Sequence, residues 1–96
     1  MEALIAYDVS TTSAEGRRRL RQVARACEGF GQRVQLSLFE VVCSESALAK
    51  LLAKLETIMD AQCDRLRVYR LVQGTLGRVE TLGQTEGFAS EQAWVL

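Results

Sequence analysis

Residues 33–43 read RVQLSLFEVVC, a stretch in which the hydrophobic period slips by one position. Up to Leu38 the apolar residues occupy even-numbered positions. From Phe39 they also occupy odd-numbered positions, which hold polar residues earlier in the stretch. A slip of this kind turns the side chains of a strand to its opposite face, so one continuous strand is not expected. A bulge or a tight reversal near Ser37 would explain it. The stretch is therefore predicted to form two short strands.

The segments on both sides of this stretch predict two helices and further strands. Thr12 and Glu15 have the spacing of a capping box, which marks the start of a helix. Ser44 can cap a second helix, whose apolar residues recur at helical spacing. Runs of β-favouring residues predict the strands. The expected order is a strand over 3–9, a helix over 13–28, the strand pair within 33–43, a helix after 44, a strand over 64–71 and a short strand over 78–82.

This order places both helices on one face of a mainly antiparallel sheet. The expected fold is a ferredoxin-like α+β sandwich of the βαββαβ type with an additional C-terminal strand. At 96 residues, the chain has the size of one small domain, whose limited core favours association with a second copy. The predicted domain covers residues 1–83. Residues 84–96 end in an apolar run too short to fold alone, and they are expected to dock on the dimer partner.

The composition excludes several classes of chemistry. The chain has no histidine, so neither a Ser-His-Asp triad nor a histidine-ligated metal site can form within it. Its three cysteines lack a C-x-x-C spacing, which favours reduced thiols in the cytoplasm over a disulfide framework or a zinc site. No signal peptide and no membrane-spanning segment are expected. Twelve basic and twelve acidic residues give a net charge of zero, so any surface for nucleic acid must be local.

Asp8 stands near the end of the first predicted strand, which is otherwise apolar, and it is the first candidate functional residue. A carboxylate there needs a partner or water, because burial without one is costly. One interpretation is that it caps the following turn through neighbouring N–H groups. The other is a magnesium ligand, because Mg²⁺ is often held by one or two carboxylates, with water and phosphate oxygens completing its shell. No second acid lies nearby in the sequence, and both interpretations stay open.

Five arginines crowd the first predicted helix. At about 100° per residue, Arg19 lies on one flank of the apolar stripe and the other four form a contiguous arc on its other side. These four are Arg17, Arg18, Arg21 and Arg25. A charge run on a helix is usually a solvated face. However, Glu28 is the only acid downstream of them in the helix, so their mutual repulsion also fits a surface that binds phosphates.

Two aromatic residues and one further arginine could extend such a surface. Tyr7 and Phe39 could stack on nucleobases of any identity, although large aromatic residues are more often buried in the core. Arg33 could add one more phosphate contact. The cysteines are interpreted as small core residues without a functional role.

Taken together, these motifs resemble the CRISPR-associated protein 2 family. The matching segments are LIAYDV at 4–9, the arginine-rich first helix, RVQLSLFE at 33–40 and RVYRL at 67–71. They occur in the order and spacing of the family, and the likeness extends from Met1 to about Leu82. The family also divides the segment that corresponds to residues 33–43 into two strands.

The resemblance implies a homodimeric endonuclease that uses Mg²⁺, or Mn²⁺ in its place, to cleave single-stranded RNA or double-stranded DNA in antiviral defence. Asp8 would be the catalytic residue and metal ligand, facing Asp8 of the second subunit across the dimer cleft. Arg17, Arg19 and Arg33 would contact nucleic acid or support catalysis, with Arg18 as the alternative if the helix alignment shifts by one residue. The expected nucleic-acid-binding set is Tyr7, Arg17, Arg18, Arg19, Arg21, Arg33, Ser37 and Phe39.

Other functions stay open on the sequence alone. The resemblance equally implies a non-catalytic role, in which the dimer bridges two dimers of CRISPR-associated protein 1 and holds duplex DNA during spacer acquisition. A toxin-like ribonuclease related to VapD shares the fold and the Tyr-Asp strand end. A ferredoxin-like module that binds a small metabolite fits the fold but leaves the arginines unexplained. The sequence decides neither between RNA and DNA nor between catalysis and scaffolding.

Overall fold

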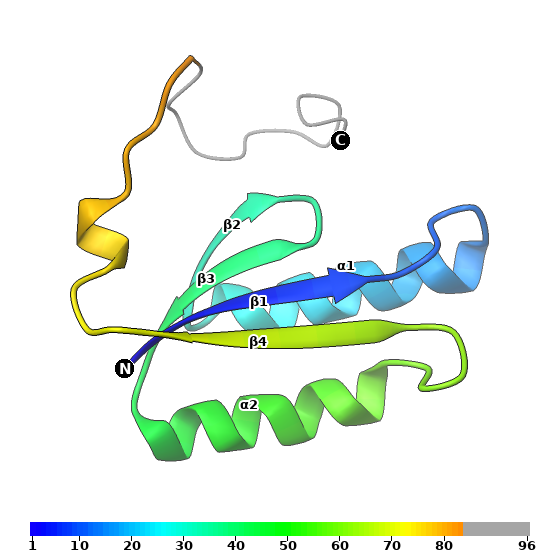
Figure 1. The fold of residues 1–96 in the computed structure, drawn as a ribbon. Helices are drawn as coiled ribbons and strands as arrows, with labels where there is room; N and C mark the ends of the chain where they lie inside the picture. Colours follow the sequence, from blue (N-terminus) through cyan, green and yellow to red (C-terminus); the bar gives the residue numbers. More distant parts are fainter. Residues whose placement is uncertain (84–96) are drawn as a thin grey trace.

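Four antiparallel strands form one sheet in the order β2-β3-β1-β4, and the two long helices lie on the same side of it (Figure 1). This computed structural model describes residues 1–83, so the predicted docking of residues 84–96 lies outside the described part. The ferredoxin-like arrangement confirms the expected βαββαβ order. The elements are β1 (Glu2–Asp8), α1 (Ala14–Glu28), β2 (Gly31–Gln35), β3 (Leu38–Val42), α2 (Glu45–Ile58), β4 (Arg65–Leu71) and a 3-10 turn, η1 (Leu76–Arg78).

The β2–β3 hairpin contains both irregularities that the slipped period allowed. The chain reverses between Gln35 and Leu38, so the predicted pair of short strands is confirmed. The register also shifts between Arg33 and Gln35, where one strand carries an extra residue. On β3, Phe39 and Val41 are buried on the helix side of the sheet, and their register partners on β2 are Arg33 and Gly31.

Helix α1 starts one residue later than the capping box predicted. The Oγ of Ser13, not that of Thr12, accepts the hydrogen bond from Gly16 N, at 3.0 Å. Thr12 instead shares a 2.9 Å side-chain hydrogen bond with Ser10. A Cβ at Gly16 would lie 1.9 Å from the carbonyl oxygen of Ser10, so the turn packs against the helix only because residue 16 is glycine. The cap of α2 is the predicted Ser44, whose Oγ accepts from Ala47 N at 3.1 Å.

Alternation along the strands divides the sheet into a buried face and an open face. The side chains of Ala3, Ile5 and Tyr7 are buried on the helix side, where they contribute to one core with the apolar stripes of α1 and α2. Each fully buried side chain of leucine size contributes about 1.5–3 kcal/mol to folding. The intervening residues of β1 and their register partners on β4 point away from the helices. Asp8 is the exposed residue at the end of this open row.

The additional strand expected over residues 78–82 was wrong for the described chain. Residues 76–78 form η1, and residues 79–82 pair with no strand within residues 1–83. Before these residues, the buried carboxylate of Glu2 accepts hydrogen bonds from Gly74 N at 2.7 Å and Leu76 N at 2.8 Å. These bonds turn the chain at the start of β1, and Figure 1 shows it leaving the sheet there. No helix within residues 1–83 has the length and apolarity required to cross a membrane.

Candidate functional site

An open groove of about 460 Å³ lies at the end of the sheet where β1 stops. Its polar lining comes from three strands and the β2–β3 turn, namely Asp8, Gln35, Ser37, Arg65, Arg67 and Tyr69. Asp8 is the register partner of Arg65, and Ala6 is that of Arg67, so β1 and β4 place one carboxylate beside two guanidinium groups. The groove therefore combines a ligand for a hard cation with donors for phosphate oxygens.

The Asp8 carboxylate accepts no hydrogen bond from residues 1–83, so the capping interpretation was wrong. Ser10 and Ser13 perform that task, since Thr12 N donates to Ser10 Oγ at 3.4 Å and Gly16 N donates to Ser13 Oγ. The described residues contain no cluster of three or more Cys, Asp or Glu side chains that could hold a metal ion. A cation at Asp8 would thus need water, phosphate or a second subunit for its other ligands.

Ser37 lies in the groove because the β2–β3 turn is tied to β1. The carbonyl oxygen of Ser37 accepts a hydrogen bond from Tyr7 N at 2.9 Å. This bond brings the turn beside the residue that precedes Asp8. The structure therefore places Ser37 and Asp8 in one groove, as the predicted site requires, although they are 29 positions apart in the sequence.

The side chains of Tyr7 and Phe39 form no stacking surface on the described chain. Their exposed fractions are 1% and 0%, because both point from the sheet into the helix-covered core. A base cannot reach a ring that is covered on both faces, so the predicted base-stacking role is corrected to a core role. The exposed aromatic residue of the groove is Tyr69, whose Oη accepts from Arg67 Nη1 at 3.1 Å.

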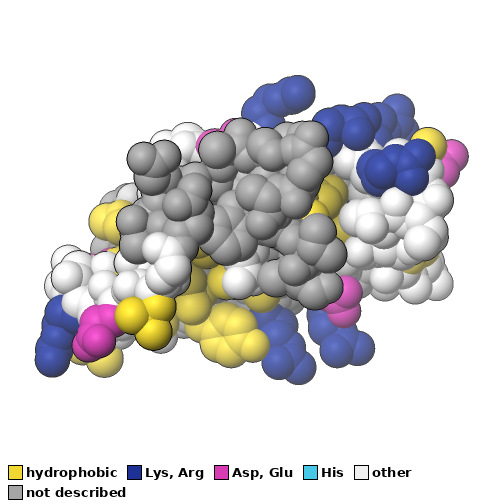
Figure 2. Space-filling view, turned by 90° about the horizontal axis from the view of Figure 1, so that it is seen from above, with side chains coloured by type: hydrophobic (Ala, Val, Ile, Leu, Met, Phe, Trp, Pro, Cys, Tyr) yellow, Lys and Arg dark blue, Asp and Glu magenta, His cyan; other side chains and the backbone are white. Residues whose placement is uncertain are grey.

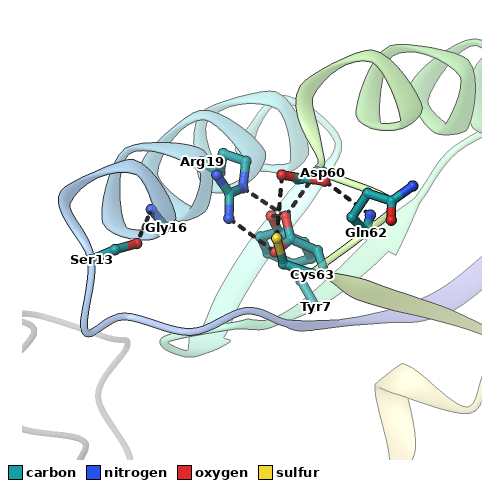
Figure 3. A network of polar contacts seen from close by, with 8 residues as sticks. Tyr7, Ser13, Gly16, Arg19, Asp60, Gln62 and Cys63 are labelled. Carbon is teal, nitrogen blue, oxygen red and sulfur yellow. Dashed lines mark hydrogen bonds and ion pairs between the residues drawn. The ribbon is translucent and has the colours of Figure 1, made fainter.

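Arg19 differs from the other α1 arginines because it forms an ion pair with the buried carboxylate of Asp64 (Figure 3). Arg19 Nε donates to Asp64 Oδ2 at 2.7 Å, and Nη2 donates to Oδ1 at 3.2 Å. The Tyr7 hydroxyl donates to the same Oδ2 at 2.5 Å. The predicted contact of Arg19 with nucleic acid is therefore corrected, since its guanidinium is engaged inside the domain.

The charge states of this cluster follow from its hydrogen bonds. Burial disfavours the ionised carboxyl of Asp64, but the hydrogen bonds from Arg19 and Tyr7 outweigh burial and lower its pKa below the ordinary value. Burial, and then the hydrogen bond to Asp64, raises the pKa of Tyr7 well above its ordinary value. The cluster is therefore a carboxylate, a guanidinium and a neutral phenol at physiological pH.

The remaining α1 arginines form the exposed arc that their spacing predicts. Arg17, Arg18, Arg21 and Arg25 are exposed, and none of them forms an ion pair with another part of residues 1–83. Arg17 Nη1 donates to the carbonyl oxygen of Thr11 at 2.9 Å. Figure 2 shows basic side chains along two opposite edges of the molecule. One basic surface thus belongs to α1, on the opposite side of the sheet from the Asp8 groove.

Arg33 lies in β2, where the register shift precedes the β2–β3 turn. Its Nε donates to the carbonyl oxygen of Leu36 at 2.8 Å, and its guanidinium carbon lies 5.9 Å from the centre of the Phe39 ring. These contacts give Arg33 a structural task in the hairpin. A contact of Arg33 with phosphate stays a prediction.

Sequence reasoning missed four polar side chains of the groove as functional candidates, Gln35 on β2 and, on β4, Arg65, Arg67 and Tyr69. The signal was present, because the alternation of residues 64–71 already put odd-numbered residues on the face opposite the apolar Leu66 and Val68. It also missed Asp64, one of two buried charged residues in the described chain. The sequence does not mark Asp64, because its side-chain partners Arg19 and Tyr7 lie 45 and 57 positions away.

The exposed arc predicts a test of nucleic-acid binding. Replacing Arg18 and Arg21 together by alanine should weaken binding to all sequences and lower the slope of log affinity against log salt by about two units. Arg17 stays in place because it holds the Thr11 carbonyl. The matched control replaces Lys50 and Lys54, two exposed cations of α2. If the slope of log affinity against log salt is equal for the two double variants, the arginine arc is a solvated face that binds no phosphate.

Comparisons with known proteins identify the family. The sequence profile of the family CRISPR associated protein Cas2 matches residues 1–79. A protein of Rhodospirillum rubrum named "CRISPR-associated endoribonuclease Cas2 3" is 49% identical over 80 residues, which are 83% of this chain and 84% of that protein. A "CRISPR-associated endonuclease Cas2" of Halalkalibacterium halodurans is 45% identical over 83 residues, which are 86% of each chain.

A solved structure agrees with these sequence matches. The crystal structure of Streptococcus pyogenes Cas2 at pH 6.5 superposes with a TM-score of 0.81 and 42% sequence identity, covering 86% of this chain and 100% of that chain. Sequence and fold point to the same family over the described domain. The chain therefore belongs to the Cas2 family of CRISPR-associated proteins.

Proposed function

We propose that this protein is a metal-dependent endonuclease that hydrolyses phosphodiester bonds of RNA or double-stranded DNA in CRISPR-based antiviral defence. The observation that carries the proposal is the Asp8 carboxylate, which is exposed, accepts no hydrogen bond from residues 1–83, and lies beside Arg65 and Arg67. Relatives that bear the names endonuclease and endoribonuclease support the reaction class. The toxin-like ribonuclease and the metabolite-binding module are not favoured, because the family profile and the relatives named above are those of Cas2.

Asp8 fits Mg²⁺, or Mn²⁺ in its place, as a single open carboxylate. Such ions keep several waters and use one or two carboxylates together with phosphate oxygens. A second copy of the chain would supply a second Asp8 if the two open faces meet about a two-fold axis. The homodimer is thus part of the proposal. Open-face side chains such as Leu4, Ala6 and Leu38 support it, because they are only partly covered within one chain.

In the mechanism, the chain's own residues bind and orient the substrate. Asp8 would hold the ion, and Arg65 and Arg67 would bind oxygens of the flanking phosphates and so orient the substrate in the groove. The bound ion supplies Lewis acidity and lowers the pKa of a coordinated water. Contacts of Arg65 and Arg67 with phosphates carry no sequence information by themselves.

The proposal is tested by the metal dependence of purified protein. Wild type should cleave RNA or duplex DNA with Mg²⁺, lose cleavage with a chelator, and regain it when Mg²⁺ or Mn²⁺ is restored. Light scattering on the chromatographic peak should place the activity in the dimer. Cleavage that persists in the chelator, or that elutes away from the protein peak, would contradict the proposed reaction.

The basic α1 face favours a second function, the bridging of two dimers of CRISPR-associated protein 1 during spacer acquisition. This face lies on the other side of the sheet from Asp8, so it can hold a duplex without presenting it to the groove. Both functions fit a cytoplasmic location, which the three free cysteines support.

A further inference from the structure

The carboxylate of Asp64 joins three parts of the fold at one point. It accepts hydrogen bonds from Tyr7 at the end of β1, from Arg19 on α1, and from Asp60 N in the loop after α2, the last at 3.0 Å. Figure 3 shows the side chains of Tyr7 and Arg19 meeting beside Asp60. The Asp64 side chain is 0% exposed and that of Arg19 is 17% exposed. The cluster therefore connects β1, α1 and the loop after α2 on the helix side of the sheet.

The chain neighbours of this cluster face the opposite side of the sheet. Tyr7 precedes Asp8, and Asp64 precedes Arg65. Successive side chains of a strand point to opposite faces, so bonds made by Tyr7 and Asp64 on the helix side constrain Asp8 and Arg65 on the open side. Asp8 and Arg65 are themselves register partners at the last pair between β1 and β4. The last residue pair between two strands opens most easily. Here the Tyr7–Asp64 hydrogen bond, on the helix side of the sheet, stabilises that pair.

We propose that Asp64 is a positioning residue, which holds Asp8 and Arg65 side by side at the groove. The inference rests on the proposed nuclease function, and it gives Arg19 and Tyr7 their role through Asp64. Arg19 neutralises the buried carboxylate, and Tyr7 transmits its position to β1 through one hydrogen bond. A displacement of about 1 Å in a reacting group can cost 10²-fold in rate, so this support has a measurable value.

The test compares Asp64→Asn with a core variant that lies at the other end of α2. Asp64→Asn keeps the shape of the side chain but removes the charge that balances Arg19. Leu48→Val thins the core near the start of α2, where Leu48 is 0% exposed. Both are measured under conditions in which they are equally folded, so that a general loss of stability affects them alike.

Two readouts report on the groove. In the NMR spectrum without metal, the amide signals of Asp8 and Arg65 should shift in Asp64→Asn and stay in place in Leu48→Val. Binding of Mn²⁺ without nucleic acid, followed by electron paramagnetic resonance, should weaken about 10-fold or more in Asp64→Asn and stay unchanged in Leu48→Val. Tyr7→Phe, which removes one hydrogen bond and keeps the ring, should show both effects to a smaller degree. Tyr7→Phe decides the question if Asp64→Asn fails to fold.

The outcomes separate this inference from the function on which it rests. Unchanged Asp8 and Arg65 signals together with unchanged Mn²⁺ binding in Asp64→Asn would overturn the positioning role while the nuclease stands. Equal loss of Mn²⁺ binding in Leu48→Val would also overturn it, because any destabilised core would then suffice. Wild-type protein that binds no Mn²⁺ and cleaves nothing would overturn the nuclease and the inference together.

Discussion

Replacing Asp8 by asparagine is expected to abolish metal-dependent cleavage and to leave the fold intact. Loss of an outer-shell partner of a metal typically costs about 10–100-fold in affinity or activity, so loss of the carboxylate itself should cost more. The side chain is exposed and accepts no hydrogen bond from residues 1–83, so folding does not depend on it. If two Asp8 carboxylates face each other in a dimer, the substitution also removes a repulsion and should maintain or raise the melting temperature.

The measurement is cleavage of RNA and duplex DNA by wild type and Asp8→Asn, with melting curves for both. A variant that cleaves as fast as wild type would show that Asp8 is not the ligand. A spacer-acquisition assay with the CRISPR-associated protein 1 partner then distinguishes catalysis from scaffolding. If Asp8→Asn loses cleavage and still supports acquisition, then scaffolding through the basic α1 face is the biological role.

Replacing Phe39 by alanine is expected to have the largest effect on stability among the candidate site residues. Phe39 is 0% exposed between the sheet and the helices, and truncation of a buried phenylalanine typically costs about 3–5 kcal/mol. A domain of this size has a free energy of unfolding of about 5–10 kcal/mol, so the variant should be close to unfolding at physiological temperature. Urea unfolding monitored by circular dichroism measures the change.

Phe39→Leu separates the core role from base stacking. It retains most of the buried apolar volume, so it should cost much less stability and leave nucleic-acid affinity unchanged. Tyr69→Ala is the matched exposed aromatic substitution, and it should change stability by no more than about 0.5 kcal/mol. A well-folded Phe39→Leu variant that has lost nucleic-acid affinity would restore the stacking interpretation.

The fold was predictable because its signals are local. The slipped period of residues 33–43 and the Ser44 cap each depend on a few neighbouring residues, and both occur in the structure. The cap of α1 was placed one residue too early, because Thr12 and Ser13 are both competent caps. What selects Ser13 is the close approach of the Ser10 carbonyl to Gly16, which involves a turn that the sequence does not mark.

The site was predictable only in part, because its contacts join distant segments. Asp8 and Ser37 were identified from motifs and do share a groove. The role of Arg19 was not predicted from the sequence. Its position on the opposite flank of the apolar stripe of α1 already distinguished it from the other arginines. Its partner Asp64 lies 45 residues away, and the Glu2 carboxylate accepts a hydrogen bond from Gly74 N, 72 residues away. Periodicity carries no information about either contact.

The central position of β1 has a consequence for biosynthesis. The first strand of the described domain pairs with β3 on one side and with β4 on the other, and its first residue, Glu2, lies opposite Leu71. The nascent chain must therefore keep β1 without its second partner until nearly the whole described domain has been translated. The pairing of β1 with β4 is therefore a late, long-range folding step. Slow folding of this kind leaves an apolar strand exposed to other nascent chains. Early capture of β1 by the β2–β3 hairpin would shorten this exposure, since β3 is translated well before β4.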